Sequence, residues 1–437
     1  NNLTIKKAGS ATSAVLNANS KSRIFKVAIN KTLTLDNLTL KGGKADGTQD
    51  ADNYGGAIYA SGATVNITNC TFKGNEAAYG GGAIYARKEG STASSIIISG
   101  GTIGGDTDED KNKVTSEWQF GGGILVENYC TLTLDSVWII GNEAWRAGGV
   151  RANRSTVNMT NCTIKNNKTT GNDDSGGGGV YTFMGRLTMT GCTITGNKAD
   201  TNGGGLNVEG TITNITNCTF TGNTAKNGGG IYTKKEEGTP PTVTISGGTI
   251  GGTGTDEKNK ATGTGPEEGN GGGIYVGEDC KVTLQNNGST GCTIAGNTAQ
   301  RGSGVYVNGD TFTMSGNAKI AVNNDVYLVT RKTITVDGTL SNNPAARITV
   351  PDDKYQSTTK VLDGSAVGSQ HAKFAVTPKG SEHWTVESGG YLTNNKTDIF
   401  NNITSDQIEA AIKAADPSMI YDGWLNNPIT NRKAKLT

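Results

Sequence analysis

A repeat that begins with a glycine triplet constrains this chain more than any other feature. Residues 203–231 read GGGLNVEGTITNITNCTFTGNTAKNGGGI and run from one triplet to the next. Copies of the pattern begin at Gly55, Gly80, Gly121, Gly148, Gly176, Gly203, Gly228, Gly271 and Gly302. Most neighbouring copies are roughly 25 to 28 residues apart, a period typical of solenoids, in which each copy forms one turn.

Each copy contains three short strand patterns separated by tight corners. In one copy these are residues 58–60, 65–67 and 70–72, which read IYA, VNI and CTF. Strands this short cannot build separate sheets at this period, but they can coil so that like strands stack in parallel about 4.8 Å apart. Since parallel crossovers are nearly always right-handed, we predict an all-β fold, a right-handed single-stranded parallel β-helix of about ten to eleven turns.

Composition and pattern divide the chain into four segments. Hydrophobic residues make up 33% of the chain, too few for a thick core but enough for a thin, regular one. Residues 1–40 are expected to form an N-terminal cap and first turn, 41–329 the regular repeats, and 330–392 irregular turns. Residues 393–437 are expected to form a helical cap and tail, because residues 405–415 (SDQIEAAIKAA) predict a helix between Ser405 as N-cap and Pro417.

Two copies are longer than the others and resemble each other. Both contain GGTIGG followed by KNK, at residues 100–113 and 247–260. Their extra residues, 106–110 with 116–120 and 253–257 with 262–270, are predicted to form protruding loops.

An asparagine recurs at one corner of the aligned copies. It occupies Asn75, Asn112, Asn142, Asn167, Asn197, Asn223, Asn259 and Asn297. Asn tolerates unusual backbone angles, and its amide can hydrogen-bond to the same residue above and below. We therefore predict a structural asparagine ladder.

Cysteine forms a second column, five residues before the asparagine. Its members are Cys70, Cys162, Cys192, Cys218 and Cys292. A zinc site would require closely paired cysteines and usually histidines, but His371 and His383 lie outside the repeats. We interpret the cysteines as small inward hydrophobic side chains, with reactive thiols or disulfides between neighbouring turns as alternatives.

The middle residue of the first strand in each copy forms a third column, expected to point outward because the flanking aliphatic residues share a face. It is occupied by Tyr59, Tyr85, Leu125, Arg151, Tyr181, Asn207, Tyr232, Tyr275 and Tyr306. The pattern favours cross-strand stacking, and an exposed stripe that binds a partner is the alternative.

A binding hot spot is predicted beside this column, where Trp145 and Arg146 lie close in sequence to Arg151 and Arg154. The complete set of candidate partner-binding residues is Tyr59, Tyr85, Trp145, Arg146, Arg151, Arg154, Tyr181, Tyr232, Tyr275 and Tyr306.

The repeats contain no recognisable catalytic or metal-binding motif. They carry no histidine, and their acidic residues lie mainly in the long loops rather than in pairs on one strand face, as general acid–base catalysis would require. The acidic loop 106–110 does not have the ligand spacing of a helix-loop-helix calcium site. We therefore expect no catalytic residue, no cofactor and no metal, although calcium binding by the acidic loops is left open.

With a net charge of +1, the chain lacks the strong positive charge that would attract nucleic acid. No apolar run approaches the roughly 18 residues that cross a bilayer. We expect a monomer that neither binds nucleic acid nor inserts into a membrane. The sequence begins without a leader pattern, as in a mature or trimmed chain, and an anchor before Asn1 is left open.

The repeat also resembles known surface proteins. GGAI at residues 55–58 and 81–84, with Phe72 and Asn75 spaced as FxxN, is similar to the repeats of chlamydial polymorphic membrane proteins. The motifs GGGIYV and LTMTGCTITGN, together with residues 312–328 and 371–386, resemble β-helix surface proteins and lipoproteins of treponemal spirochaetes. The resemblance covers roughly residues 1–392.

This resemblance implies an exported, non-enzymatic bacterial protein at the cell surface or outside the cell, with adhesin-like binding of a host protein or glycan. Fold analogy alone does not supply an activity. A carbohydrate-active enzyme, either a polysaccharide lyase or a glycoside hydrolase, and a purely structural spacer are the alternatives.

Overall fold

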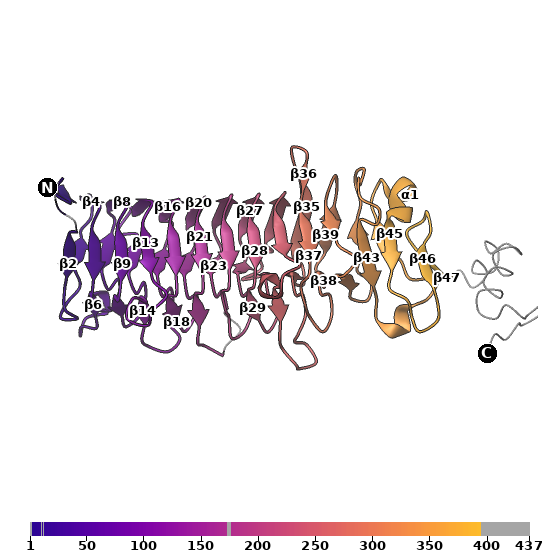
Figure 1. The fold of residues 1–437 in the computed structure, drawn as a ribbon, viewed down its shortest axis with the longest axis horizontal. Coiled ribbons are helices and arrows are strands. Elements are labelled where there is room, and N and C mark those ends of the chain that lie inside the picture. Colours follow the sequence, from indigo (N-terminus) through magenta and orange to yellow (C-terminus); the bar gives the residue numbers. More distant parts are fainter. Residues whose placement is uncertain (1, 10, 12, 173–175, 395–437) are drawn as a thin grey trace, which may run out of the picture.

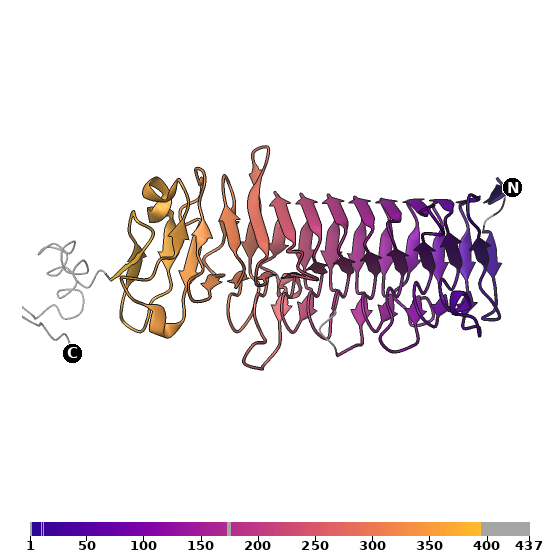
Figure 2. The same cartoon turned by 180° about the vertical axis from the view of Figure 1, so that it is seen from behind.

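The computed structural model describes residues 2–9, 11, 13–172 and 176–394, and the chain coils into an elongated parallel β-helix (Figure 1). Strands of successive turns stack in long rows that run from the N-terminal to the C-terminal end, as the reverse view also shows (Figure 2). The helix expected at residues 405–415 lies outside the described residues.

Sheet one is built from the Thr-rich strand of each turn and has 14 strands in the described part of the chain. Its parallel strands are β1 (Leu3–Lys6), β4 (Thr32–Asp36), β8 (Thr64–Thr68), β12 (Ser95–Ser99), β16 (Thr131–Asp135), β20 (Thr156–Thr160), β24 (Arg186–Thr190), β27 (Ile212–Thr216), β31 (Thr242–Ser246), β35 (Lys281–Asn287), β39 (Thr311–Met314), β42 (Ile334–Thr335) and β44 (Leu362–Asp363). The short strand β36 (Thr290–Gly291) pairs antiparallel with β35 in a protruding hairpin.

Sheet two contains the strand that follows the cysteine column. Its strands are β2 (Val15–Asn17), β5 (Thr39–Lys41), β9 (Thr71–Lys73), β13 (Thr102–Gly104), β17 (Trp138–Ile140), β21 (Thr163–Lys165), β25 (Thr193–Thr195), β28 (Thr219–Thr221), β32 (Thr249–Gly251), β37 (Thr293–Ala295) and β40 (Lys319–Ile320).

Sheet three contains the strand that follows the glycines. Its strands are β3 (Phe25–Val27), β7 (Ile58–Ser61), β11 (Ile84–Arg87), β15 (Ile124–Glu127), β19 (Val150–Asn153), β23 (Val180–Phe183), β26 (Leu206–Glu209), β30 (Ile231–Lys234), β34 (Ile274–Val276), β38 (Val305–Val307), β41 (Val326–Leu328), β43 (Ala346–Thr349) and β45 (Phe374–Val376). With 13 strands in the described residues, the coil is longer than the ten to eleven turns expected, because strands at both ends continue the pairing without glycine triplets.

Short strands lie between sheets two and three. They are β6 (Lys44–Ala45), β10 (Glu76–Ala77), β14 (Lys113–Val114), β18 (Glu143–Ala144) and β22 (Lys168–Thr169), then β29 (Thr224–Ala225) and β33 (Lys260–Ala261).

The remaining elements are short. They are η1 (Asp50–Asn53), η2 (Thr255–Glu257), η3 (Asp352–Lys354), α1 (Val367–Gln370) and η4 (His371–Lys373), with β46 (Trp384–Val386) paired antiparallel to β47 (Leu392–Asn394). Trp384, Val386 and Leu392 are buried against the last turns, so this hairpin covers that end of the core.

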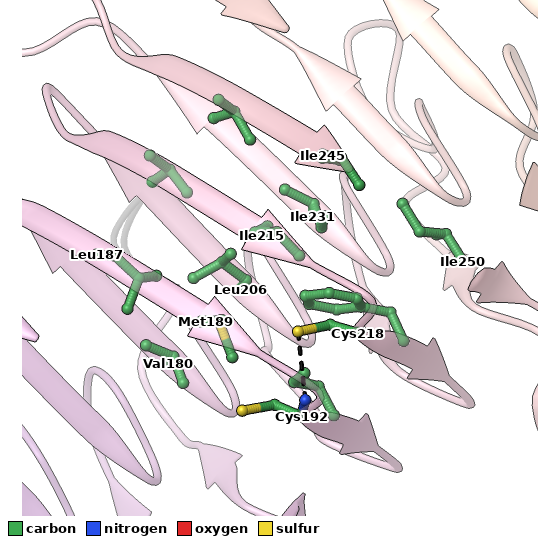
Figure 3. Packing of buried hydrophobic residues seen from close by; sticks show 14 of the residues in the cluster. Val180, Leu187, Met189, Cys192, Leu206, Ile215, Cys218, Ile231, Ile245 and Ile250 are labelled. Atoms are coloured by element: carbon green, nitrogen blue, oxygen red, sulfur yellow. Dashed lines mark hydrogen bonds between the residues drawn. The ribbon is translucent and has the colours of Figure 1, made fainter. Parts of the chain in front are cut away.

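The core is one continuous column of aliphatic, cysteine and phenylalanine side chains inside the coil. Leu187 and Met189 of β24 point toward Val180 of β23, and the same layer recurs in the next turns (Figure 3). All seven cysteines are buried and unpaired, and the backbone N–H of Cys192 lies 3.3 Å from the sulfur of Cys218. Their interpretation as inward hydrophobic side chains is confirmed.

The predicted asparagine ladder is present. Each side-chain amide donates to the amide oxygen of the Asn one turn further on, from Asn75 to Asn112 at 2.8 Å through to Asn259 and Asn297 at 2.9 Å. The structure adds a final member, Asn324, which accepts from Asn297 at 3.2 Å. Since these side chains are buried, each bond satisfies groups that water cannot reach.

The glycine triplets have a backbone role. Gly203 has φ of +68°, which L side chains rarely adopt. A Cβ on Gly204 would lie 2.5 Å from the carbonyl oxygen of Gly229 in the next turn. The triplet is therefore required for adjacent turns to approach at this corner.

Candidate functional site

The predicted third column lies on the outer side of sheet three. Its residues pair in register from Tyr59 and Tyr85 to Tyr275 and Tyr306, and the structure extends it to Tyr327 of β41. Tyr59, Tyr85 and Leu125 form a hydrophobic cluster separate from the main core. Val326–Leu328 shows the same aliphatic–tyrosine–aliphatic alternation as the other strands of this column, although no glycine triplet precedes it.

The column is largely buried and does not form the continuous exposed stripe of the alternative interpretation. Tyr59 and Tyr181 are each only 2% exposed, and Tyr232 and Tyr275 are half-buried. At the N-terminal part of the column, the cover comes from residues before the glycine triplets. Tyr54 and Phe120, for example, pack onto the cluster of Tyr59, Tyr85 and Leu125.

Cross-strand stacking, the favoured interpretation, is confirmed. The rings of Tyr232 and Tyr275 stack with centroids 4.7 Å apart, those of Tyr275 and Tyr306 lie 5.1 Å apart, and those of Tyr306 and Tyr327 lie 5.6 Å apart. These rings cover one another's faces, so the stack stabilises sheet three and offers a partner mainly ring edges.

A buried polar cluster interrupts the tyrosines in the middle of the column. The guanidinium of Arg151 lies 3.6 Å from the centroid of Tyr181 and 4.7 Å from that of Phe120. The hydroxyl of Tyr181 donates to Glu209 at 2.6 Å, and the amide of Asn207 donates to the other oxygen at 3.1 Å. Burial raises the pKa of Glu209, opposed by the Tyr181 hydrogen bond and the charge of Arg151.

The two carboxylates beside the column are too far apart to act as a catalytic pair. Glu127 accepts the hydroxyl of Tyr85 at 2.8 Å, and its column continues through Asn153 and Phe183 to Glu209. Three turns separate Glu127 from Glu209, about 14 Å at the usual strand spacing. Glycoside hydrolysis needs carboxyl groups roughly 5 to 9.5 Å apart.

An aromatic and arginine patch forms where the hot spot was predicted. We call Trp118, Phe120, Trp145 and Arg146 the tryptophan patch. Trp118, in the first long loop, is 52% exposed. Its ring lies 5.4 Å from that of Trp145, and the guanidinium of Arg146 lies 5.5 Å from its centroid.

The patch differs in membership from the predicted hot spot. Arg151 is buried below it, and Arg154 lies elsewhere, paired with Glu237 at 2.7 Å. Trp118 was not among the predicted residues, because the long loop that contains it reaches Trp145 only in the folded chain.

A groove of about 480 Å³ lies further along the coil, at the C-terminal end of the tyrosine stack. Its lining comprises Arg301, Tyr327, Thr349, Val350, Pro351, Asp352, Tyr355, Thr377, Pro378, Lys379 and Gly380. Asp352 is the one carboxylate in this lining, so the groove does not hold the carboxyl pair of a glycoside hydrolase either. None of the sequence patterns indicated this groove.

Lysines pair with two of the acidic side chains in loop 106–110. Asp108 pairs with Lys111 at 2.5 Å and Asp110 with Lys73 at 3.0 Å. Among the described residues, no three His, Cys, Asp or Glu side chains gather in an arrangement that would hold a metal ion. Within the same residues, no helix has the length and apolar character to traverse a bilayer.

Stacked parallel sheets, an internal asparagine ladder and a surface with an aromatic patch and a groove define a solenoid protein of the parallel β-helix class. The family described as "Right handed beta helix region" matches residues 26–215 and 107–287, more than half of the chain. The chain belongs to this family, which also confirms the predicted handedness. Comparisons with curated proteins and with solved structures found no match.

Proposed function

We propose that this protein is a non-enzymatic, adhesin-like binding protein of a bacterial cell surface or the extracellular space, and that it binds a host protein through the tryptophan patch. One observation carries the proposal: Trp118 is 52% exposed although its ring is held against Trp145 and Arg146. Trp and Arg dominate the binding energy of protein interfaces.

The scaffold suits this role. The patch rests on a rigid coil, because Arg146 also lies over Phe120, which packs on the cluster of sheet three. Ordering the patch on binding would therefore cost little side-chain entropy. The wide separation of Glu127 and Glu209 supports the non-enzymatic part of the proposal.

Binding to host cells and to an array of host extracellular proteins tests the proposal. Trp118 has φ of +66°, so Trp118→Asn suits its backbone, because Asn tolerates this region. We expect it to weaken binding at least about tenfold, a typical effect of losing a hot-spot residue.

Trp138→Thr is the matched control. Trp138 is 51% exposed on sheet two, and both of its paired neighbours, Thr102 and Thr163, are threonines. Equal losses in both variants would contradict a specific patch. The absence of any bound protein would favour the spacer, and release of sugars from a polysaccharide panel would favour the enzyme.

A further inference from the structure

The tyrosine stack ends abruptly inside the described coil. Tyr327 stacks on Tyr306 with 5° between the ring planes. The next position in the register is Thr349, whose hydroxyl lies 2.7 Å from that of Thr377. Two small side chains thus follow four stacked rings.

The groove occupies the space that further tyrosines would fill. Tyr327, Thr349 and Thr377 all line it, and one face of Tyr327 is already covered by Tyr306. The ring therefore borders the groove as the end of the stack. A flat ligand placed on Thr349 and Thr377 would continue the stack by one more layer.

The polar groups of the groove favour a ligand that carries hydroxyl groups over a ligand that is a plain aromatic ring. Lys379 uses one N–H to donate to the backbone oxygen of Asp352 at 2.7 Å, and an ammonium has three donors. Arg301 and the threonine hydroxyls add further hydrogen-bonding groups, and the Asp352 carboxylate is an acceptor. Lys379, Arg301 and the threonines already make some hydrogen bonds. An apolar ring would leave their remaining donors and acceptors, and the Asp352 carboxylate, desolvated and unpaired, which costs free energy.

From this arrangement, we propose that the groove binds one pyranose ring of a glycan, with its apolar face against Tyr327 and its hydroxyls toward Thr349, Lys379 and Asp352. A sugar ring combines an apolar face with edge hydroxyls that both donate and accept. The groove presents the same combination, because the rings of Tyr327 and Tyr355 line it together with a few placed polar groups, as in small-molecule sites generally. This site is separate from the tryptophan patch.

The key variant fills the groove without disturbing the fold. Thr349→Tyr extends the register by one ring, so we expect it to fold and to gain a stacking contact. Tyr327→Ala removes the ring at the end of the stack, against which the sugar is proposed to lie. Thr335→Tyr is the matched control, because Thr335 is a half-buried threonine on sheet one, in the same part of the coil but outside the groove.

The experiment measures binding of methyl glycosides and oligosaccharides to the full chain by saturation-transfer NMR and calorimetry. The panel includes neutral, uronic-acid and sialic-acid sugars. We expect at least one sugar to bind, and Thr349→Tyr and Tyr327→Ala each to lower its affinity at least about tenfold. Thr335→Tyr and Trp118→Asn should each stay within about twofold of the original chain, since neither changes the groove.

Several outcomes would overturn the proposal. These are no binding of any sugar at millimolar concentration, unchanged affinity in a folded Thr349→Tyr protein, and equally tight binding of phenylalanine amide. Melting temperatures establish that each variant is folded. Because the tryptophan patch is tested with host proteins and Trp118→Asn, failure of one site is distinguishable from failure of the other.

Discussion

The side-chain amide of Asn167 donates to the amide oxygen of Asn197 at 3.0 Å, and both residues are fully buried. The same oxygen also accepts the backbone N–H of Asn167 at 3.0 Å. One side chain thus holds two groups of the preceding turn, and its own amide continues the ladder to Asn223.

Replacing a ladder residue should be costly. Asn197→Ala leaves the backbone N–H and the side-chain amide of Asn167 without their acceptor, so we expect a loss of about 3 kcal/mol in the free energy of unfolding. Chemical denaturation measures this change. Asn158→Ala, on the outer side of sheet one, should cost no more than about 0.5 kcal/mol. Equal effects would show that the ladder contributes little.

The glycine corner predicts a second stability difference. Gly204→Ala places a methyl group 2.5 Å from the carbonyl oxygen of Gly229, so the turns must move apart at a cost of about 1 to 3 kcal/mol. Gly368→Ala, where no atom lies within 4 Å of the added carbon, should be neutral or slightly stabilising. Thermal unfolding compares the two, and a neutral Gly204→Ala would refute the close approach.

The cysteines should be inert in the folded protein. Burial raises the pKa of Cys130 and Cys280 to about 11 and that of Cys292 to about 12. A hydrogen bond with Cys192 lowers the pKa of Cys218, but Cys218 is only 2% exposed. Because reaction needs an accessible thiolate, a disulfide-exchange reagent should label none of the seven cysteines before unfolding and all of them afterwards.

Glu209 should make stability depend on pH. Burial raises its pKa above the ordinary 4.5, so the folded state binds this proton more tightly than the unfolded state. The Glu209 contribution to the free energy of unfolding therefore falls as pH rises from about 4.5 through the raised pKa.

Glu209→Gln removes this contribution while keeping an acceptor for Asn207. Arg151 and Lys234 are the cations that act on Glu209, and neither changes in the variant. The stability of Glu209→Gln relative to the original chain should rise as the pH increases above about 4.5, the ordinary pKa of a glutamate. Denaturation at several pH values checks this, and a difference constant with pH would contradict the burial argument.

Much of the fold could be predicted because each turn repeats the same local constraints. The asparagine ladder and the inward cysteines followed from position within the repeat, since stacked turns bring equal positions together. The C-terminal end of the coil was harder to predict. Tyr327 belongs to the tyrosine column of sheet three, but no glycine triplet precedes Tyr327 to mark a further copy of the repeat.

The exposure of the tyrosine column could not be predicted from the strands. Alternation predicted the outward direction of Tyr59 and Tyr181, but Tyr54 and Phe120 pack over the cluster of Tyr59, and the guanidinium of Arg151 lies over Tyr181. Burial on an outer face depends on how connecting segments cross it. Strand periodicity carries no information about those paths.

The sequence by itself determined the coil, the stacking register and the internal ladder, because a short period allows only one way to bury its apolar positions. Only the tertiary structure decided where the two proposed binding surfaces lie. Trp118 reaches Trp145 through a long loop, and the groove beside Tyr327 opens because Thr349 follows it in the stack. Both features are departures from the repeat, and their surroundings are set by contacts between segments far apart in the chain.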